Sequence, residues 1–280
     1  MPFRLANVAG RAALVDASDQ WYDLERVTAG RLGPDPMDVL ADTDALHEVA
    51  ARLDALSAGG SLLDAALEAP VPRPRNVFGV GLNYRTHAAE SGVEVPTTPV
   101  VFGKFPSCVA GPGHAVELRS ATADWEVELV VAIGRPGRDI AEADAWDHVA
   151  GLTVGQDISD RVLQFAAKPA HFDLGKSRDG YGPIGPVLVS PDAVADRDAL
   201  SLSCSVNGHA KQADSTASLI FSVPQLVAYL SGVMTLSSGD LIFTGTPAGV
   251  GVASRTFLQP GDVIESTIEG IGTLVTRCVA

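Results

Sequence analysis

DWEVELVVAIG, the sequence of residues 124–134, combines a β-branched apolar run with acidic residues at two alternate positions. This composition predicts a β-strand. Successive strand side chains point to opposite faces of a sheet, so Glu126 and Glu128 share one face. The opposite face is entirely apolar and carries Trp125, Val127, Leu129, Val131 and Ile133.

The two glutamates admit two interpretations. They could face solvent, which the strand alone favours because buried carboxylates are rare. If they are buried, they repel each other, and burial raises their pKa unless a cation compensates. The stretch GLTVGQDIS at residues 151–159 supports burial, because it predicts a second apolar strand that ends at Asp157. Three carboxylates on adjacent strands would form an all-oxygen site for Mg²⁺, Mn²⁺ or Ca²⁺ rather than zinc.

The remaining pattern predicts a β-rich α+β fold rather than an alternating βαβ fold, because short apolar runs bounded by Gly, Pro and Asp outnumber helical stretches. The helical stretches are Tyr84–Ser91, Asp160–Ala166 and Pro224–Gly232. The expected strands are Asn76–Val80, Val100–Lys104, Val127–Ile133, Val187–Val189, Ser201–Val206, Leu241–Thr244, Asp262–Ile268 and Leu274–Val279.

Residues 1–70 are predicted to form a small separate N-terminal module. It begins with short apolar stretches and continues with the helical pattern Asp42–Leu56. The segment PVPRPR at residues 70–75 follows, and its three prolines make a stiff, extended connector. We therefore place a domain boundary there, with a catalytic domain over residues 71–280.

Composition excludes several classes of protein. The chain has 280 residues and is 46% hydrophobic, which is incompatible with a disordered chain. A net charge of −14 without a basic patch argues against nucleic-acid partners. No apolar run is long enough to span a membrane and the start lacks a signal-peptide core, so a cytoplasmic location is expected. The three scattered cysteines predict buried free thiols rather than disulfides or a zinc site.

A strand–turn–helix segment, GVGLNYRTHAAE at residues 79–90, supplies a candidate base. His87 and Glu90 are three residues apart and so share one helical face. A carboxylate beside an imidazole fixes its tautomer, as a general base requires, although a surface His–Glu pair is the common alternative.

Two motifs typical of nucleotide-binding proteins are incomplete in this sequence. Tyr84 replaces the third glycine of a GxGxxG motif, and Ala170 replaces the first glycine of a P-loop.

Taken together, these segments resemble the fumarylacetoacetate hydrolase family, including its bacterial acylpyruvase and 2-hydroxyhepta-2,4-diene-1,7-dioate isomerase members. The resemblance covers about residues 74–280, and its specificity lies in the order of the motifs rather than in any one of them. Besides DWEVELVVAIGR at 124–135 and GVGLNYRTHAAE at 79–90, the motifs are VFGKFPS at 101–107, VAGLTVGQDISDRVLQ at 149–164, GKSRDGYGPIGP at 175–186, NGHAKQADST at 207–216, GDLIFTGTPAGVG at 239–251 and the closing GDVIESTIEGIGTL.

This resemblance implies a catalytic β-roll or sandwich of mixed strands, a Mg²⁺ or Mn²⁺ cofactor and a homodimer. It implies that Glu126, Glu128 and Asp157 are the metal ligands, in agreement with the strand argument. It further implies that His87 and Glu90 lie on a lid helix and that Lys176 is catalytic. The residues that it assigns to substrate binding are Lys104, Arg161, Gln164 and, in a TGTP loop, Thr246.

The implied activity is hydrolysis of a carbon–carbon bond in a 2,4-dioxo acid, of acylpyruvate or fumarylpyruvate type. Water activated by His87 and Glu90 would attack the distal carbonyl, and a metal-stabilised pyruvate enolate would leave. The alternatives that use the same site are decarboxylation of oxaloacetate and isomerisation or tautomerisation of a 2-hydroxy-dienoate. A non-catalytic binding domain is a further alternative. Asp160, Val162 and the stretch Ser177–Tyr181 depart from the usual family pattern, which leaves the exact substrate open.

Overall fold

Strand β11 (Val127–Ile133), the predicted strand of the DWEVELVVAIG stretch, lies inside a large mixed sheet. The computed structural model describes residues 1–280. β11 pairs antiparallel with β12 (Val149–Gln156) on one side and with β17 (Leu241–Phe243) on the other. The order of strands is β4-β3-β2-β1-β14-β12-β11-β17-β6-β7, with β5 paired to β1 and β8 paired to β14. Their bounds are β1 (Arg4–Val8), β2 (Arg11–Val15), β3 (Gln20–Asp23), β4 (Gly60–Ser61), β5 (Leu67–Glu68), β6 (Val77–Gly81), β7 (Val100–Lys104), β8 (Val109–Ala110) and β14 (Gly182–Val189).

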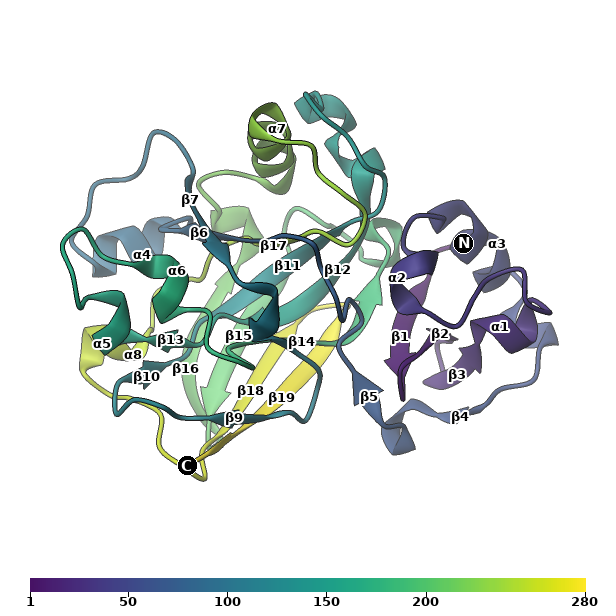
Figure 1. The fold of residues 1–280 in the computed structure, drawn as a ribbon, viewed down its shortest axis with the longest axis horizontal. Coiled ribbons are helices and arrows are strands. Elements are labelled where there is room, and N and C mark those ends of the chain that lie inside the picture. Colours follow the sequence, from purple (N-terminus) through teal and green to yellow (C-terminus); the bar gives the residue numbers. More distant parts are fainter.

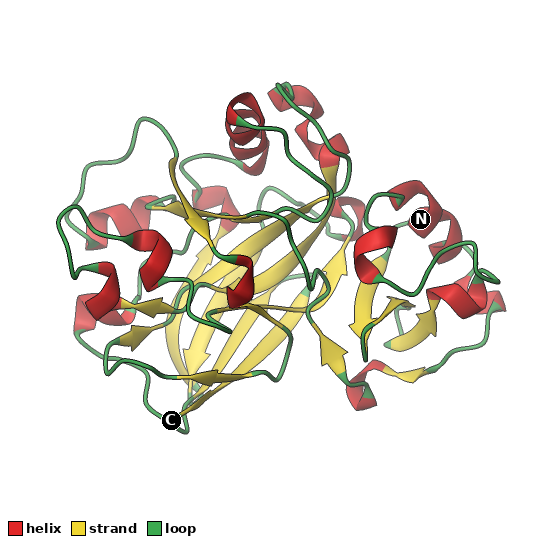
Figure 2. Ribbon diagram, in the orientation of Figure 1, coloured by secondary structure: helices red, strands yellow, loops and turns green.

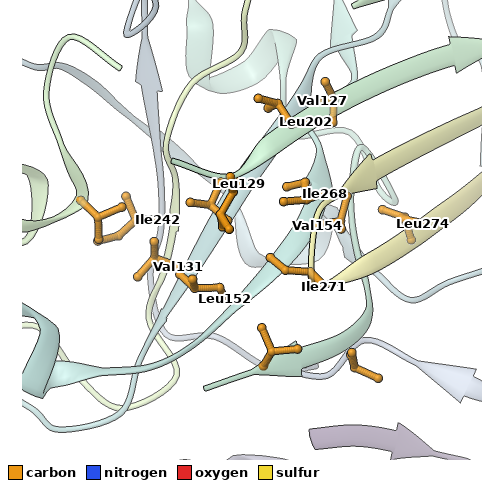
Figure 3. Packing of buried hydrophobic residues seen from close by; sticks show 14 of the residues in the cluster. Val127, Leu129, Val131, Leu152, Val154, Leu202, Ile242, Ile268, Ile271 and Leu274 are labelled. Atoms are coloured by element: carbon orange, nitrogen blue, oxygen red, sulfur yellow. The ribbon is translucent and has the colours of Figure 1, made fainter. Parts of the chain in front are cut away.

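A second sheet covers one face of the first (Figure 2). Its order is β16-β15-β18-β19-β9, with bounds β9 (Ala115–Glu117), β15 (Ser201–Val206), β16 (His209–Ser215), β18 (Val263–Ile268) and β19 (Gly272–Val279). The apolar face of β11 packs into the space between the sheets: Figure 3 shows Val127 and Leu129 among Leu202, Ile268 and Leu274. The alternation predicted for this strand therefore builds the main core.

The N-terminal residues cover part of the opposite face of the large sheet. Val130 and Ala132 of β11 belong to a second buried cluster, together with Leu5, Leu14 and Leu46 of the N-terminal region. Helices α1 (Leu24–Val27), α2 (Pro36–Val39) and α3 (Thr43–Ala50) flank this cluster. β1 pairs with β14, so the N-terminal strands extend the large sheet rather than forming a separate one. The boundary near residue 70 stays a prediction.

Short helices gather at the end of the molecule that lies away from the N-terminal module (Figure 1). They are α4 (Arg85–Glu90), α5 (Arg161–Gln164), α6 (Phe172–Gly175) and α8 (Gly251–Ser254), beside the two-stranded pair β10 (Ala123–Asp124) and β13 (Ser159–Asp160). The longest helix, α7 (Val223–Val233), packs elsewhere, against the 3₁₀ turn Glu142–His148. The other 3₁₀ turns are Leu53–Ala55, Leu62–Asp64, Pro106–Cys108, Pro191–Ala193 and Thr216–Ser218. None of the helices is both long and apolar enough to cross a membrane.

The structure confirms the β-rich α+β fold and most of its predicted elements. The strands Val100–Lys104, Val127–Ile133 and Ser201–Val206 have the predicted bounds. The three cysteines are free and buried, as predicted. The predicted helix Asp42–Leu56 is shorter, because α3 begins after its cap Asp42 and ends at Ala50.

We expect the Leu129→Ala variant to lose about 2–5 kcal/mol of free energy of unfolding, because the truncation leaves a cavity between the two sheets. Leu129 is fully buried in the main cluster. Urea denaturation followed by circular dichroism measures the loss. Val162→Ala, at an exposed position, is the matched control and is expected to change the free energy by less than about 0.5 kcal/mol. Equal losses in the two variants would contradict this description of the core.

Candidate active site

Three carboxylates meet where β11 begins and β12 ends. Glu126 directly precedes β11, Glu128 lies within it, and Asp157 directly follows β12. The antiparallel register aligns these ends, and the Asp157 amide donates a hydrogen bond to the Glu126 carbonyl at 2.9 Å. The side chains offer carboxylate oxygens within 4.8 Å of one another. Glu126, Glu128 and Asp157 are 5%, 2% and 0% exposed, so the solvent-facing interpretation of the two glutamates is wrong.

Two lysines supply positive charge to these carboxylates. The Nζ atom of Lys176 lies 2.6 Å from Glu126 Oε2 and 2.7 Å from Asp157 Oδ2. The Nζ atom of Lys104 lies 2.6 Å from Asp157 Oδ1 and also donates to the Lys176 carbonyl. Both lysine side chains are buried. The two lysines therefore approach Asp157 through different oxygens.

The carboxylates differ in their electrostatic environment. Burial and the negative charges of Asp157 and Glu126 raise the pKa of Glu128 well above its ordinary value. Burial would also raise the pKa of Glu126, but Lys176 and Arg161 outweigh it and lower that pKa to about 2. Glu128 is consequently the carboxylate of the cluster whose ionised form the surrounding cations stabilise least. A further cation at this position would favour the ionised form of Glu128.

The donor set fits a hard divalent cation. The three groups present only carboxylate oxygens, which Mg²⁺ and Mn²⁺ prefer to zinc. The raised pKa of Glu128 shows that the protein's own cations leave the cluster short of positive charge. Glu126, Glu128 and Asp157 are therefore the residues that could hold the metal.

Arg161 and Asp124 hold Glu126 in place. The guanidinium of Arg161 donates to Asp124 Oδ2 at 2.8 Å, to Glu126 Oε1 at 2.6 Å and to Gln164 Oε1 at 2.9 Å. Asp124 also accepts hydrogen bonds from the amides of Gly251 and Val252 at 2.6 and 2.9 Å. The Arg161–Gln164 pair thus contacts a carboxylate of the cluster directly, and Asp124 ties it to the start of α8.

The predicted TGTP loop positions Glu128. The Gly245 amide donates to Glu128 Oε2 at 2.8 Å. The Thr246 hydroxyl donates to the Val127 carbonyl at 2.9 Å and accepts from Gln212 Nε2 at 2.8 Å. The Thr244 hydroxyl donates to the Leu129 carbonyl at 2.9 Å, so the loop is bonded to β11 on both sides of Glu128.

Helix α4 places His87 and Glu90 beside this loop. His87 Nδ1 lies 3.5 Å from Glu90 Oε2, and the His87 side chain is 13% exposed. The Gly249 amide donates to both oxygens of Glu90, at 3.0 and 3.2 Å. Asn83, which precedes the helix, donates to the Thr244 carbonyl at 2.8 Å. Glu90 therefore holds both the imidazole and the loop that follows the TGTP motif.

A cavity of about 290 Å³ brings most of the predicted residues together. Its polar lining contains the three carboxylates together with His87, Arg161, Gln164, Lys176 and Thr246. Lys104 does not line the cavity and instead contacts Asp157. Glu90 does not line it either, but it contacts the lining residue His87 and the Gly249 amide. The functional roles assigned to these residues stay predictions.

Sequence reasoning missed several residues of the site. Asp124 and Gln212 were within quoted motifs, but no spacing indicates which distant partners they bind. The aromatic lining residues Phe102, Phe165 and Phe172 were also missed, because isolated aromatic residues resemble core residues in sequence. The apolar motif VFGKFPS was the only signal that could have identified one of them.

The chain matches a known enzyme family and several related proteins. The family described as fumarylacetoacetate (FAA) hydrolase, C-terminal, matches residues 76–279. The mitochondrial oxaloacetate tautomerase of Homo sapiens is 43% identical over 215 residues, which are 75% of this chain and 68% of that protein.

Solved structures share the fold over nearly the whole chain. An HpcE protein from Mycobacterium smegmatis, whose crystal structure is solved, has a sequence 45% identical to this chain. The two structures match with a TM-score of 0.91, and the match covers 99% of each chain. Maleylpyruvate hydrolase from Sphingobium sp. SYK-6, in complex with manganese(II) and pyruvate, is 30% identical, with a TM-score of 0.82. That match covers 99% of this chain and 98% of the other.

Proposed function

Because this chain belongs to the fumarylacetoacetate hydrolase family, we propose that it is a Mg²⁺- or Mn²⁺-dependent hydrolase that cleaves a carbon–carbon bond in a 2,4-dioxo acid. The observation that carries the proposal is the position of His87. It lines the same cavity as the carboxylate cluster, and Glu90 holds its ring. Hydrolysis requires a base that takes a proton from water, and His87 has the position for that task.

The reaction divides between the two sides of the cavity. A divalent cation at Glu126, Glu128 and Asp157 would supply Lewis-acid polarisation of the carboxylate and 2-oxo end of the substrate. His87 takes a proton from a water molecule as the water oxygen bonds to C4. The π electrons of the C4 carbonyl move to its oxygen as the water adds. This oxyanion re-forms the carbonyl as the C3–C4 bond breaks, and the electron pair of that bond leaves with the pyruvate enolate. The proton taken up by His87 is returned at C3, which gives pyruvate and the carboxylic acid.

Lys176 supports the departure of the enolate. Its ammonium group lies within 2.7 Å of two carboxylates of the cluster and also lines the cavity. A buried positive charge placed before the reaction stabilises negative charge that develops on the substrate. Glu90 orients the His87 imidazole and, through Gly249, keeps α4 against the loop that follows Thr246.

A second candidate function is tautomerisation of oxaloacetate. The human mitochondrial oxaloacetate tautomerase is 43% identical to this chain over the matched residues, which supports the candidate. Tautomerisation requires proton transfer but no attacking water. Decarboxylation of oxaloacetate and isomerisation of a 2-hydroxy-dienoate would use the same carboxylates and the same lysine.

A substrate panel tests the proposal. The purified protein is incubated with acylpyruvates, fumarylpyruvate, oxaloacetate and 2,4-dioxo sugar acids, with Mg²⁺ or Mn²⁺, and the products are identified by mass spectrometry and absorbance. We expect pyruvate and a carboxylic acid from an acylpyruvate, and no turnover in the presence of a chelator. Rapid keto–enol conversion of oxaloacetate without any dioxo-acid cleavage would instead establish the second candidate.

The homodimer and the cytoplasmic location stay predictions from the resemblance and the composition. Sedimentation equilibrium of the protein measures the first directly. The small-molecule cavity supports an oxo acid as the binding partner.

A further inference from the structure

We propose that the preferred substrates carry a short, uncharged apolar acyl chain rather than a second carboxylate, and that Phe165 and Phe172 form the wall that selects it. This inference rests on the proposed dioxo-acid hydrolysis and names the substrate class within it. It follows from the cavity lining, in which the arginine and lysine are paired with the carboxylate cluster and three of the other residues are phenylalanines.

Every positive charge of the cavity lining is committed at the carboxylate end. Arg161 donates to Asp124, Glu126 and Gln164 with three of its nitrogens. Lys176 is held between Glu126 and Asp157. His87 is the one remaining basic residue of the lining, and the proposed reaction uses it as the base. A distal carboxylate would therefore lose water without gaining an ion pair.

The lining of the cavity also has an extensive apolar part. Seven of its seventeen lining residues are hydrophobic, and three of these are phenylalanines. The Phe102 and Phe172 rings pack with centroids 5.6 Å apart. Gly79 permits this arrangement, because a Cβ atom at that position would lie 2.3 Å from the Phe102 ring. Phe165, 55% exposed, and Val93 complete the wall at its rim.

The size of the cavity limits the chain length. A 2,4-dioxo acid places its carboxylate and 2-oxo group together at one end, so its acyl chain must occupy the space beyond C4. A volume of about 290 Å³ lies at the lower end of small-molecule sites. The cavity therefore suits a dioxo acid with a few methylene groups in its acyl chain.

A matched pair of substrates tests the inference on the Mn²⁺-loaded enzyme. Pentanoylpyruvate and succinylpyruvate have acyl chains of similar length, and only the second ends in a carboxylate. We expect kcat/KM to be at least about tenfold higher for pentanoylpyruvate. From acetylpyruvate to pentanoylpyruvate, kcat/KM should rise about fourfold for each methylene group that the wall buries. Equal or higher kcat/KM for succinylpyruvate would overturn the inference.

Two arginine substitutions, one within α5 and one at the residue that caps its C-terminus, locate the selectivity. Phe165→Arg places a cation at the rim and is expected to raise the succinylpyruvate-to-pentanoylpyruvate ratio of kcat/KM about tenfold. Val162→Arg is the matched control, since Val162 is 63% exposed within α5 and does not line the cavity. It should keep the ratio of the unsubstituted enzyme. The same ratio change in both variants would remove Phe165 from the selecting wall.

Binding measurements separate this inference from the proposed function. Titration calorimetry of both compounds into the Mn²⁺-loaded protein reports the preference even if neither is cleaved. Tighter binding of pentanoylpyruvate without cleavage would reject the hydrolase proposal and retain the apolar wall. Cleavage of both with a preference for succinylpyruvate would do the reverse.

Discussion

The Glu126→Gln variant is expected to lose metal binding and turnover together. The amide keeps the volume of the side chain and can still accept a hydrogen bond from Arg161, which now donates to Glu126 Oε1. It removes the negative charge and one oxygen donor from the cluster. Loss of supporting residues around a metal commonly lowers affinity 10–100-fold, and loss of a ligand should cost at least about 100-fold. Titration calorimetry with Mn²⁺ and a turnover assay measure both losses.

Glu126→Ala should have the same effect on activity with an additional loss of stability. Arg161 and Lys176 would each lose a buried partner, and breaking a buried ion pair costs about 3–5 kcal/mol. Glu48→Ala is a control, because the Arg31–Glu48 pair is exposed and distant from the cavity. Full turnover of either Glu126 variant at ordinary Mg²⁺ concentrations would reject the metal assignment.

His87→Ala is expected to lower kcat for acylpyruvate hydrolysis by about 10²–10⁴-fold, the usual contribution of a positioned acid–base group. Metal affinity should survive, because His87 makes no hydrogen bond to the carboxylate cluster. Glu90→Ala should reduce kcat less, since Glu90 only orients the ring. It should also raise KM, because it releases the Gly249 amide from α4.

The same variant separates the two candidate functions. Conversion of oxaloacetate needs no attacking water, so the ratio of acylpyruvate hydrolysis to oxaloacetate conversion should fall in His87→Ala. Steady-state kinetics with both substrates on one protein preparation give this ratio. If both activities fall by the same factor, His87 does not act specifically on water, and the hydrolase proposal loses its mechanistic support.

Sequence periodicity predicted the strand that builds both the core and the carboxylate cluster. Side chains alternate between the two faces of a strand, so the sequence assigns Leu129 to one face and Glu128 to the other. Local backbone geometry alone fixes this alternation. Asp157 could be joined to the pair because it directly follows a second apolar stretch, which forms β12. Burial of the glutamates was not readable from β11 alone, since it depends on helices that come from elsewhere in the chain.

Long-range partners and turn-like composition explain what could not be predicted. Asp124 and Arg161 are 37 residues apart and meet only in the folded chain. Residues 182–186 read GPIGP, which resembles a turn, yet they form the first half of β14. Pairing of these residues with β8 and β12 overrides their weak local preference.

The two-sided use of β11 restricts how this enzyme can diverge. A single residue inserted or deleted between Glu126 and Glu128 would place the two carboxylates on opposite faces of the sheet. A single residue inserted or deleted after Glu128 would reverse the facing of either Glu128 or the core residues that follow it. Such length changes would disrupt the core or the carboxylate cluster, so we expect this strand to change by substitution rather than by insertion or deletion. Phe165 directly follows the short helix α5 and is exposed, so the strict alternation of faces in β11 does not restrict it. New substrate ranges are therefore most readily acquired at the cavity rim, while the strand beneath it keeps its length.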